Sequence, residues 1–185
     1  MNEFEMLKRL IMVDRSIRRF DNARTVGKDT LMSLINLTRF CASGRNLQPL
    51  KYRIVCESDE CAKVFPLLKW AGYLSDWDGP VKDERPTAYL VQCLDTRMTE
   101  NQMCDDGLQL QALTLGARAL GIGGCIIKSF NEIGIKKGLG LEDYYKPLYI
   151  LALGYPVEKV VLEDMSVVDN DIKYYRTPDG VHHVP

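Results

Sequence analysis

The chain has 185 residues, of which 46% are apolar and 26% are charged, with 24 basic and 25 acidic side chains. At roughly 150 residues per domain, this length predicts a single domain spanning residues 1–185. A formal charge of −1 argues against nucleic-acid binding by phosphate neutralisation. No apolar run reaches the roughly 18 residues that a membrane helix needs, so we expect no membrane insertion.

Cysteines and histidines give no sign of a disulfide framework or a metal site. The cysteines are Cys41, Cys56, Cys61, Cys93, Cys104 and Cys125, and none forms a Cys-x-x-Cys pair. Scattered cysteines in a chain of this length favour reduced, buried thiols in a cytoplasmic protein. His182 and His183 are adjacent, and no second cluster supplies matching ligands, so we expect no metal.

Hydrophobic periodicity predicts the elements in chain order. Helices are expected at residues 4–13, 28–40, 59–70, 101–120 and 132–137, and strands at 51–56, 88–94, 123–127 and 148–153. The strand at 88–94 is apolar almost throughout, which indicates a central position. A loop at 73–85 is long enough to be functional, and Trp70 before it and Trp77 within it are either core residues or an aromatic lid over a planar cofactor. Residues 157–185 are expected to form an extended arm on the body or on a second subunit, completing an α+β domain.

The first segment with chemical potential is Arg15-Ser16-Ile17-Arg18-Arg19-Phe20. In an extended chain Ser16 and Arg18 point the same way, with Arg15 close behind. A hydroxyl and guanidinium groups in that arrangement could bind a phosphate through charge-assisted hydrogen bonds. The alternative is a solvated basic turn.

The second segment, residues 42–50, combines small residues with uncharged polar ones. Ser43, Asn46 and Gln48 supply donors and acceptors that suit a flat heterocycle such as a flavin or a base. The alternative is a helix-to-strand turn that uses glycine and asparagine for their backbone freedom.

The third segment, residues 121–129, is rich in glycine but follows a predicted helix, so it lacks the dinucleotide-binding fingerprint. Its strand ends in Lys128 and Ser129, which could present edge amides and one cation to a ligand; a plain buried strand is the alternative. Because the sequence offers no Ser/His/Asp or Cys/His set, a cofactor would carry the chemistry if the protein is an enzyme.

Together, the three segments resemble the nitroreductase family of FMN-dependent oxidoreductases. The first is similar to the family's Arg-Ser-x-Arg-x-Phe motif, and Ser43–Pro49 is similar to its Ser-x-x-Asn-x-Gln-Pro motif about 25 residues later. Leu120–Gly123 and Leu153–Pro156 resemble later landmarks. The resemblance covers residues 5–156.

The resemblance implies a three-layer α/β/α sandwich with a mostly antiparallel central sheet and an extended C-terminal arm. It also implies an obligate homodimer with FMN at the subunit interface. The first segment would hold the phosphate and ribityl chain, the second would come from the other subunit, and the third would line the isoalloxazine edge. The residues so assigned to FMN are Arg15, Ser16, Arg18, Ser43, Asn46, Gln48, Ile126, Ile127, Lys128 and Ser129.

This chain differs from the family pattern near the predicted phosphate site. Asp14 stands where many members have a second basic residue. Many relatives also continue beyond the position of Pro185 to basic residues that reach the phosphate, a role that Arg176 or Lys173 could take over.

The reaction implied by the resemblance has two steps. NAD(P)H delivers a hydride to the flavin and leaves, and a small acceptor such as a nitroaromatic or a quinone then takes the electrons. No residue of the chain would be a nucleophile, because the flavin carries the chemistry. The alternatives are a flavin-binding or flavin-sequestering protein without turnover, and a family variant specialised for dehalogenation or flavin fragmentation.

Overall fold

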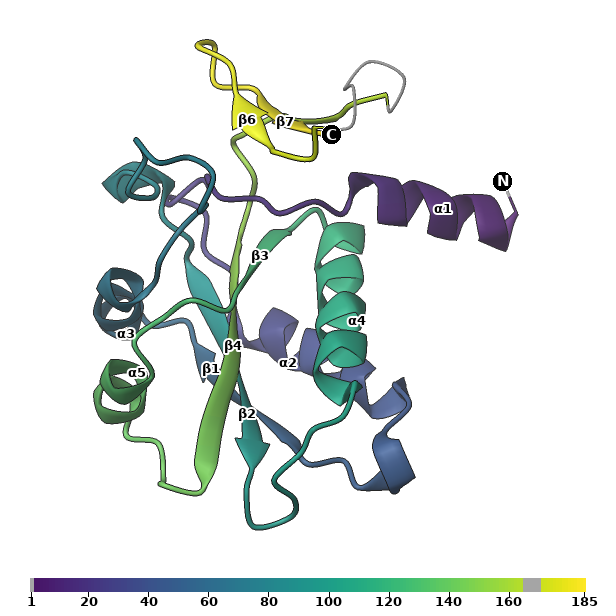
Figure 1. Cartoon of the computed structure of the whole chain (residues 1–185), viewed down its shortest axis with the longest axis vertical. Helices are drawn as coiled ribbons and strands as arrows, with labels where there is room; N and C mark the ends of the chain where they lie inside the picture. The colour runs from purple at the N-terminus through teal and green to yellow at the C-terminus, as the bar shows by residue number, and fades with distance from the viewer. Residues whose placement is uncertain (1, 165–170) are drawn as a thin grey trace.

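A four-stranded antiparallel sheet forms the centre of the molecule (Figure 1). The computed structural model describes residues 2–164 and 171–185. In spatial order the strands are β1 (Leu50–Val55), β2 (Ala88–Asp95), β4 (Tyr145–Gly154) and β3 (Gly123–Ile127). The α-helices are α1 (Glu3–Val13), α2 (Lys28–Leu37), α3 (Ser58–Val64), α4 (Asp105–Ala119) and α5 (Glu132–Leu139).

Helices cover both faces of this sheet. On one face Tyr89 of β2 belongs to a core cluster with Val64 of α3 and Ile135 of α5. On the other face Leu90 of β2 packs in a cluster with residues of α2 and α4, including Leu113. Every residue of β2 is buried, as expected for a strand in the middle of the sheet. The predicted α+β three-layer sandwich is therefore confirmed.

Helix ends differ from the periodicity by a few residues, for identifiable reasons. The helix predicted over 59–70 leaves the α conformation at Val64 and continues as a 3₁₀ turn, Phe65–Leu67, that contains Pro66. Proline has no N–H to continue an α-helix. The helix predicted from residue 101 begins at Asp105, because Met103 has a φ of 54°, in the left-handed region.

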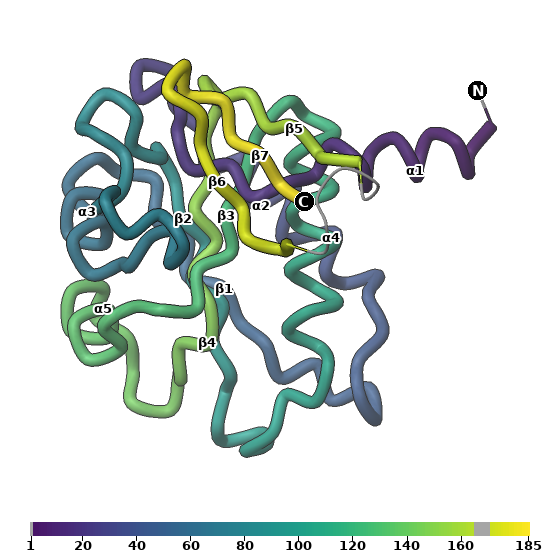
Figure 2. Tube along the Cα trace, turned by 45° about the horizontal axis from the view of Figure 1, so that its top comes forward, coloured from purple at the N-terminus to yellow at the C-terminus, as the bar shows by residue number. Residues whose placement is uncertain are grey.

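The predicted arm forms a second, three-stranded sheet in the described residues after 156. Its strands are β5 (Val160–Leu162), β6 (Tyr175–Arg176) and β7 (His182–Val184). β7 lies in the middle, parallel to β5 and antiparallel to β6; Figure 2 shows these strands side by side. Residues 165–170 of the predicted arm lie outside the described residues. Strands of two or three residues are too short to produce a period-2 pattern, so the sequence did not reveal them.

Helix α1 projects from the body of the molecule (Figures 1 and 2). None of its residues is buried in the chain. After α1 ends at Val13, the first segment continues as an extended chain beside β3. No helix in the described part of the chain is both long and apolar enough to cross a membrane.

The first segment is locked against the ends of β3 and β4. The Ile17 amide donates to the Gly124 carbonyl at 2.9 Å, and Phe20, fully buried, pairs with Pro156. A Cβ atom at Gly154 would lie only 2.8 Å from Cδ1 of Phe20. Phe20 of the first motif therefore contacts Gly154 and Pro156 of the last motif. This close approach requires glycine at position 154.

Two glycine-to-alanine substitutions should change stability in opposite directions. Gly154→Ala forces its new methyl group against the Phe20 ring, and overpacking of this kind costs about 1–3 kcal/mol. Gly138→Ala, near the end of α5, meets no atom within 4 Å and should stabilise the fold by about 0.5–1 kcal/mol. Urea unfolding of both variants measures the difference. Equal stability of the two variants would contradict the close packing of Phe20 on Gly154.

Candidate functional site

A cavity of about 320 Å³ lies between the first segment, α4, β3 and the C-terminal sheet. Its walls are formed by Asp14, Arg15, Ser16, Arg18, Gln111, Thr114, Gly124, Ile126, Tyr174, His182 and Val184. Arg15, Ser16 and Arg18, predicted to hold a phosphate, all line it. The structure thus brings the first segment together with two residues of the third segment, Gly124 and Ile126.

Arg18 is the most enclosed cation of this cavity, with only 8% of its surface exposed. Its Nη1 lies 3.1 Å from Nε2 of His182, and its Cζ lies 4.8 Å from the centre of the Tyr174 ring. Because a guanidinium can only donate, Nε2 of His182 must accept, and the neutral ring carries its proton on Nδ1. That Nδ1 is buried and has no hydrogen-bond partner. The cavity wall therefore holds a donor that lacks an acceptor.

His182 is kept neutral by its surroundings. The side chain is 1% exposed, and this burial, together with the nearby Arg18, Arg176 and His183, lowers the pKa of His182 to about 4. A positive imidazolium would be unfavourable both in a dry environment and beside guanidinium groups. At neutral pH the ring therefore accepts from Arg18 without competing with it for an anion.

Asp14 and Arg15 are held by local contacts at the end of α1. Oδ2 of Asp14 accepts from the Thr114 hydroxyl at 2.6 Å and from Gln111 Nε2 at 2.9 Å. The Arg15 guanidinium donates to the carbonyls of Ile11 and Met12 at 3.2 and 3.3 Å, where the last carbonyls of the helix lack internal partners. The cavity thus holds one carboxylate as well as two guanidinium groups.

Glu158 joins the first segment to the C-terminal sheet. Its carboxylate accepts from the backbone amides of Arg18 and Arg19, the latter at 3.2 Å, and from Nη2 of Arg176 at 2.9 Å. The side chain of Glu158 is fully buried in this network. Arg176 and Lys173, considered above as substitutes for the basic residues of relatives, do not line the cavity. Arg176 is instead committed to Glu158.

The second segment lies around a separate cavity of about 230 Å³, whose lining includes Ser43, Asn46 and Gln48. The Ser43 hydroxyl donates to Oδ2 of the buried Asp105 at 2.6 Å and accepts from the Gln48 amide at 2.9 Å. Gln48 Nε2 donates to Oδ1 of Asn46 at 3.0 Å. The first residue of α4 therefore anchors the segment.

The backbone of the second segment is strained. Arg45, Asn46 and Gln48 have φ angles of 52°, 55° and 52°, in the left-handed region that non-glycine residues rarely adopt. Asn46 and Gln48 are exposed in spite of this cost. Strain of this kind is found where a site must present particular side chains.

The side chains of the residues assigned in the third segment lie in different surroundings. Ile126 is 41% exposed and lines the first cavity, whereas Ile127 is 4% exposed and belongs to the core on the opposite face. Lys128 Nζ donates to the Leu148 carbonyl at 3.0 Å and lies 4.3 Å from the Tyr149 ring centre. Ser129 uses its carbonyl to accept from the Lys69 amide. Only Ile126 of these four faces the cavity.

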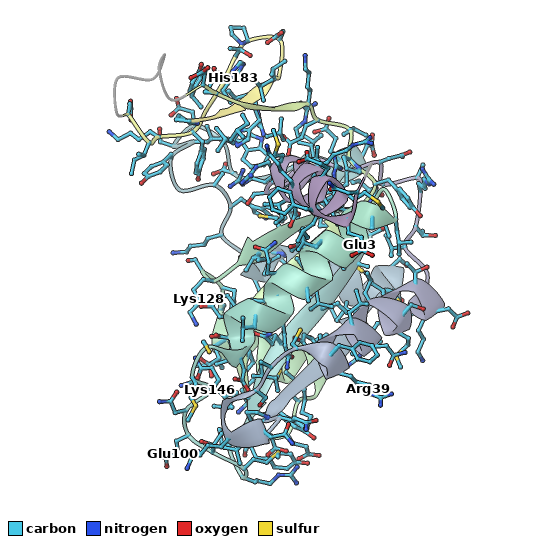
Figure 3. All side chains as sticks on the ribbon, turned by 90° about the vertical axis from the view of Figure 1, so that its right-hand side faces the viewer. Glu3, Arg39, Glu100, Lys128, Lys146 and His183 are labelled. Atoms are coloured by element: carbon cyan, nitrogen blue, oxygen red, sulfur yellow. The ribbon has the colours of Figure 1, made fainter. Side chains whose placement is uncertain are left out.

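No described residue lines both cavities of one chain, although both reach α4, the second through Gln109 and the first through Gln111 and Thr114. In Figure 3, Arg39, which lines the second cavity, lies well below His183, which neighbours His182 of the first cavity, along the long axis. The residues that sequence reasoning missed in the first cavity are Gln111, Thr114, Tyr174 and His182. The adjacent histidines were the one visible signal, and they were considered only as metal ligands.

Comparison with known proteins gives one family and one fold. A family model described as "Nitroreductase family" matches residues 11–73 and 75–155. A structure from Parabacteroides distasonis, named as an NADH dehydrogenase/NAD(P)H nitroreductase, is 23% identical, with a TM-score of 0.71 over 90% of this chain and 96% of that chain. A nitroreductase family protein from Streptococcus pneumoniae is 18% identical, with a TM-score of 0.70 over 90% and 98%.

A third structure, from Exiguobacterium sibiricum, was solved in complex with FMN and is named as a nitroreductase. It is 19% identical, with a TM-score of 0.68 over 81% of this chain and 88% of that chain. At these identities the likeness establishes a shared fold.

Replacement of His182 should flatten the acid side of the stability profile. Below pH 6.5 the unfolded chain binds a proton at His182 that the folded chain does not bind until about pH 4, so stability falls across this window. Within this window His182 alone lowers the free energy of unfolding by up to about 1.4 kcal/mol for each unit that the pH falls. In His182→Gln, whose amide oxygen can still accept from Arg18, urea unfolding between pH 7 and 4 should show a shallower fall. A His182→Gln profile parallel to the wild type would contradict the prediction.

Proposed function

Because the chain belongs to the nitroreductase family, we propose that it is an FMN-dependent oxidoreductase that takes electrons from NAD(P)H. The electrons pass to a small acceptor such as a nitroaromatic or a quinone, and the donor leaves before the acceptor binds. The family match covers both the first and the second segment. No residue of the chain acts as a nucleophile in this proposal.

The observation that carries the proposal is the donor set of the first cavity. Arg18 and Arg15 supply cations, Ser16 supplies a hydroxyl, and His182 supplies a buried Nδ1–H without an acceptor. A phosphate offers the oxygen acceptors that this set lacks, so the residues fit the anionic end of FMN. When bound, FMN supplies two-electron redox chemistry that no side chain can provide.

Asp14 limits the affinity of this site rather than abolishing it. Its negative charge lies in the same cavity as the proposed phosphate, which raises the cost of binding an anion. Thr114 and Gln111 hold its Oδ2 and share that charge. Among the described residues of this cavity, the two arginines leave a net positive balance, which favours the anion.

A homodimer would bring the two cavities together. In the proposed complex the second segment of one subunit faces the first cavity of the other, and Ser43, Asn46 and Gln48 contact the flat ring system. Ile126 flanks the same ring, while Ile127, Lys128 and Ser129 contribute through their main chain. The strained and exposed second segment supports this arrangement, since backbone strain of this kind is found at sites that contact a ligand.

Helix α1 supports the dimer from its exposed apolar surface. Phe4, Leu7 and Ile11 are 69%, 50% and 46% exposed, at positions that share one helix face. A helix of this length is marginally stable in water without packing partners. We therefore propose that a second copy of the chain covers this face.

A second candidate function is flavin binding without turnover. The observation that favours it is the Asp14 carboxylate, whose negative charge weakens the phosphate site. The two functions differ in what happens to bound FMN when a reductant is added.

Arg18→Gln should weaken FMN binding about tenfold or more. The substitution removes a charged hydrogen-bond donor worth about 1.5–3 kcal/mol, and tenfold corresponds to about 1.4 kcal/mol. Fluorescence titration of the purified protein with FMN measures the affinity. Arg53→Gln is the control, because Arg53 is a partly buried arginine, paired to Glu60, that lines neither cavity.

Anaerobic addition of NADH or NADPH to the FMN-loaded protein then separates turnover from storage. Loss of the visible flavin absorption, followed by its recovery when a quinone is added, supports the oxidoreductase. A flavin that stays oxidised supports storage. Failure of the wild-type protein to take up FMN at all would remove both functions.

Leu7→Glu should convert the protein to a monomer and impair FMN uptake. The substitution places a charge on the exposed face of α1, where a proposed subunit contact would have to bury it. Since α1 buries no residue within its own chain, the subunit itself should remain folded. Sedimentation and circular dichroism measure both properties. Ile133→Glu, at a residue that is 81% exposed on α5, is the control and should stay dimeric; a monomeric wild type would refute the arrangement.

A further inference from the structure

A further cavity, of about 270 Å³, lies on the α3 side of the central sheet and plays no part in the proposed flavin site. Its walls come from α3, from the beginning of β2, and from two chain segments near residues 22–25 and 82–87. Tyr89, which lines it, belongs to the core cluster on the α3 and α5 face. No residue is shared with the lining of the cavity around Arg18.

The charge of this cavity is positive and uncompensated. Arg85 and Lys82 line it, and no aspartate or glutamate does. Within the described residues, no carboxylate lies within ion-pair distance of either cation. Glu84, their neighbour in sequence, is instead bound to Arg19 in a pair of short contacts at 2.6 and 2.7 Å. A negatively charged group would be attracted here.

Two buried polar atoms belonging to residues of the cavity wall lack partners. Tyr89 is 0% exposed, and its hydroxyl has no hydrogen-bond partner. Nε of Arg85 is also buried without an acceptor. Most buried polar groups in proteins are paired, and each that is not costs stability. Both atoms can donate, so each is a candidate donor to an acceptor oxygen of a ligand in this cavity.

The remaining walls suit a flat apolar body. The Arg85 guanidinium lies 3.9 Å from the centre of the Phe65 ring, which fixes its plane against an aromatic surface. Ala62 and Pro86 add further apolar surface. Cys61 is an uncharged part of the wall: burial raises the pKa of its thiol to about 12, and its Sγ donates to the Thr87 carbonyl. An un-ionised thiol is a poor nucleophile, so binding here would be non-covalent.

We propose that this cavity binds a small organic carboxylate with a flat apolar body. The carboxylate would accept from the Arg85 guanidinium and the Tyr89 hydroxyl, with Lys82 at the mouth, and the body would lie along Phe65. A carboxylate fits better than a neutral polar group because charge-assisted hydrogen bonds to a guanidinium are the stronger kind. The site is separate from the flavin cavity and does not depend on the proposed redox activity.

Benzoate is a suitable probe, with uncharged benzamide as its matched comparison. Calorimetric titration of the intact protein, saturated with added FMN, should give saturable 1:1 binding to each chain on the order of 1 mM. Amide chemical shifts should change at residues 56–65 and 82–89. Benzamide should bind at least about fivefold more weakly because it carries no charge.

Three variants test the assignment of the donors. Arg85→Gln should weaken benzoate binding about tenfold or more. Tyr89→Phe should weaken it about threefold while raising the unfolding midpoint of the ligand-free protein, because an unpartnered buried hydroxyl has been removed. Lys63→Gln removes a nearby exposed charge on α3 outside the cavity lining and should leave the affinity unchanged.

The Tyr89→Phe variant keeps the test decisive even if Arg85→Gln does not fold. The proposal is overturned if benzoate does not bind saturably up to about 20 mM, a concentration well above the expected dissociation constant. It is also overturned if benzamide binds equally well, or if Tyr89→Phe binds as tightly as the wild type. Benzoate that changes the flavin absorption and leaves residues 82–89 unperturbed would have bound at the flavin and would refute this site.

Discussion

The buried carboxylate of Glu158 holds the first cavity together. It accepts from two successive backbone amides of the first segment and from Arg176 of the C-terminal sheet. A buried carboxylate is tolerated only when its oxygens are well satisfied, so this arrangement fixes both partners at once. One wall of the cavity is thereby tied to the other, and His182 is held against Arg18. Without this link, the C-terminal sheet would have no ionic connection to the first segment among the described residues.

Each chain carries two incomplete parts of the proposed flavin site. The first cavity has cations and a donor without an acceptor, and the second has uncharged polar groups on a strained backbone. In one chain the two parts are separate cavities with no described lining residue in common. An exposed apolar helix adjoins the first cavity, because α1 leads directly into Arg15. A symmetric pair of chains would explain the separation, the strain and the exposed helix together.

Some of the site was visible in the sequence because it depends on short local patterns. The grouping of Ser16 and Arg18 on one side of an extended segment follows from the period of two, and both residues line one cavity. The third segment shows the limit of such patterns. Alternation sends Ile126 to the cavity and Ile127 to the core, and Lys128 reaches a carbonyl of β4 that no local pattern identifies. The positively charged cavity beside Tyr89 was not visible either, since its walls come from three separate segments between residues 22 and 89.

The sequence by itself determined the class of fold, the central position of β2 and the family, because periodicity and ordered motifs are properties of the chain alone. The tertiary structure decided which charges remain available: Arg176 is taken by Glu158, Arg19 by Glu84, and Asp14 is held by α4. A pairing between distant residues depends on how sheets and helices stack, and this is why the chemistry of the site emerged only in three dimensions.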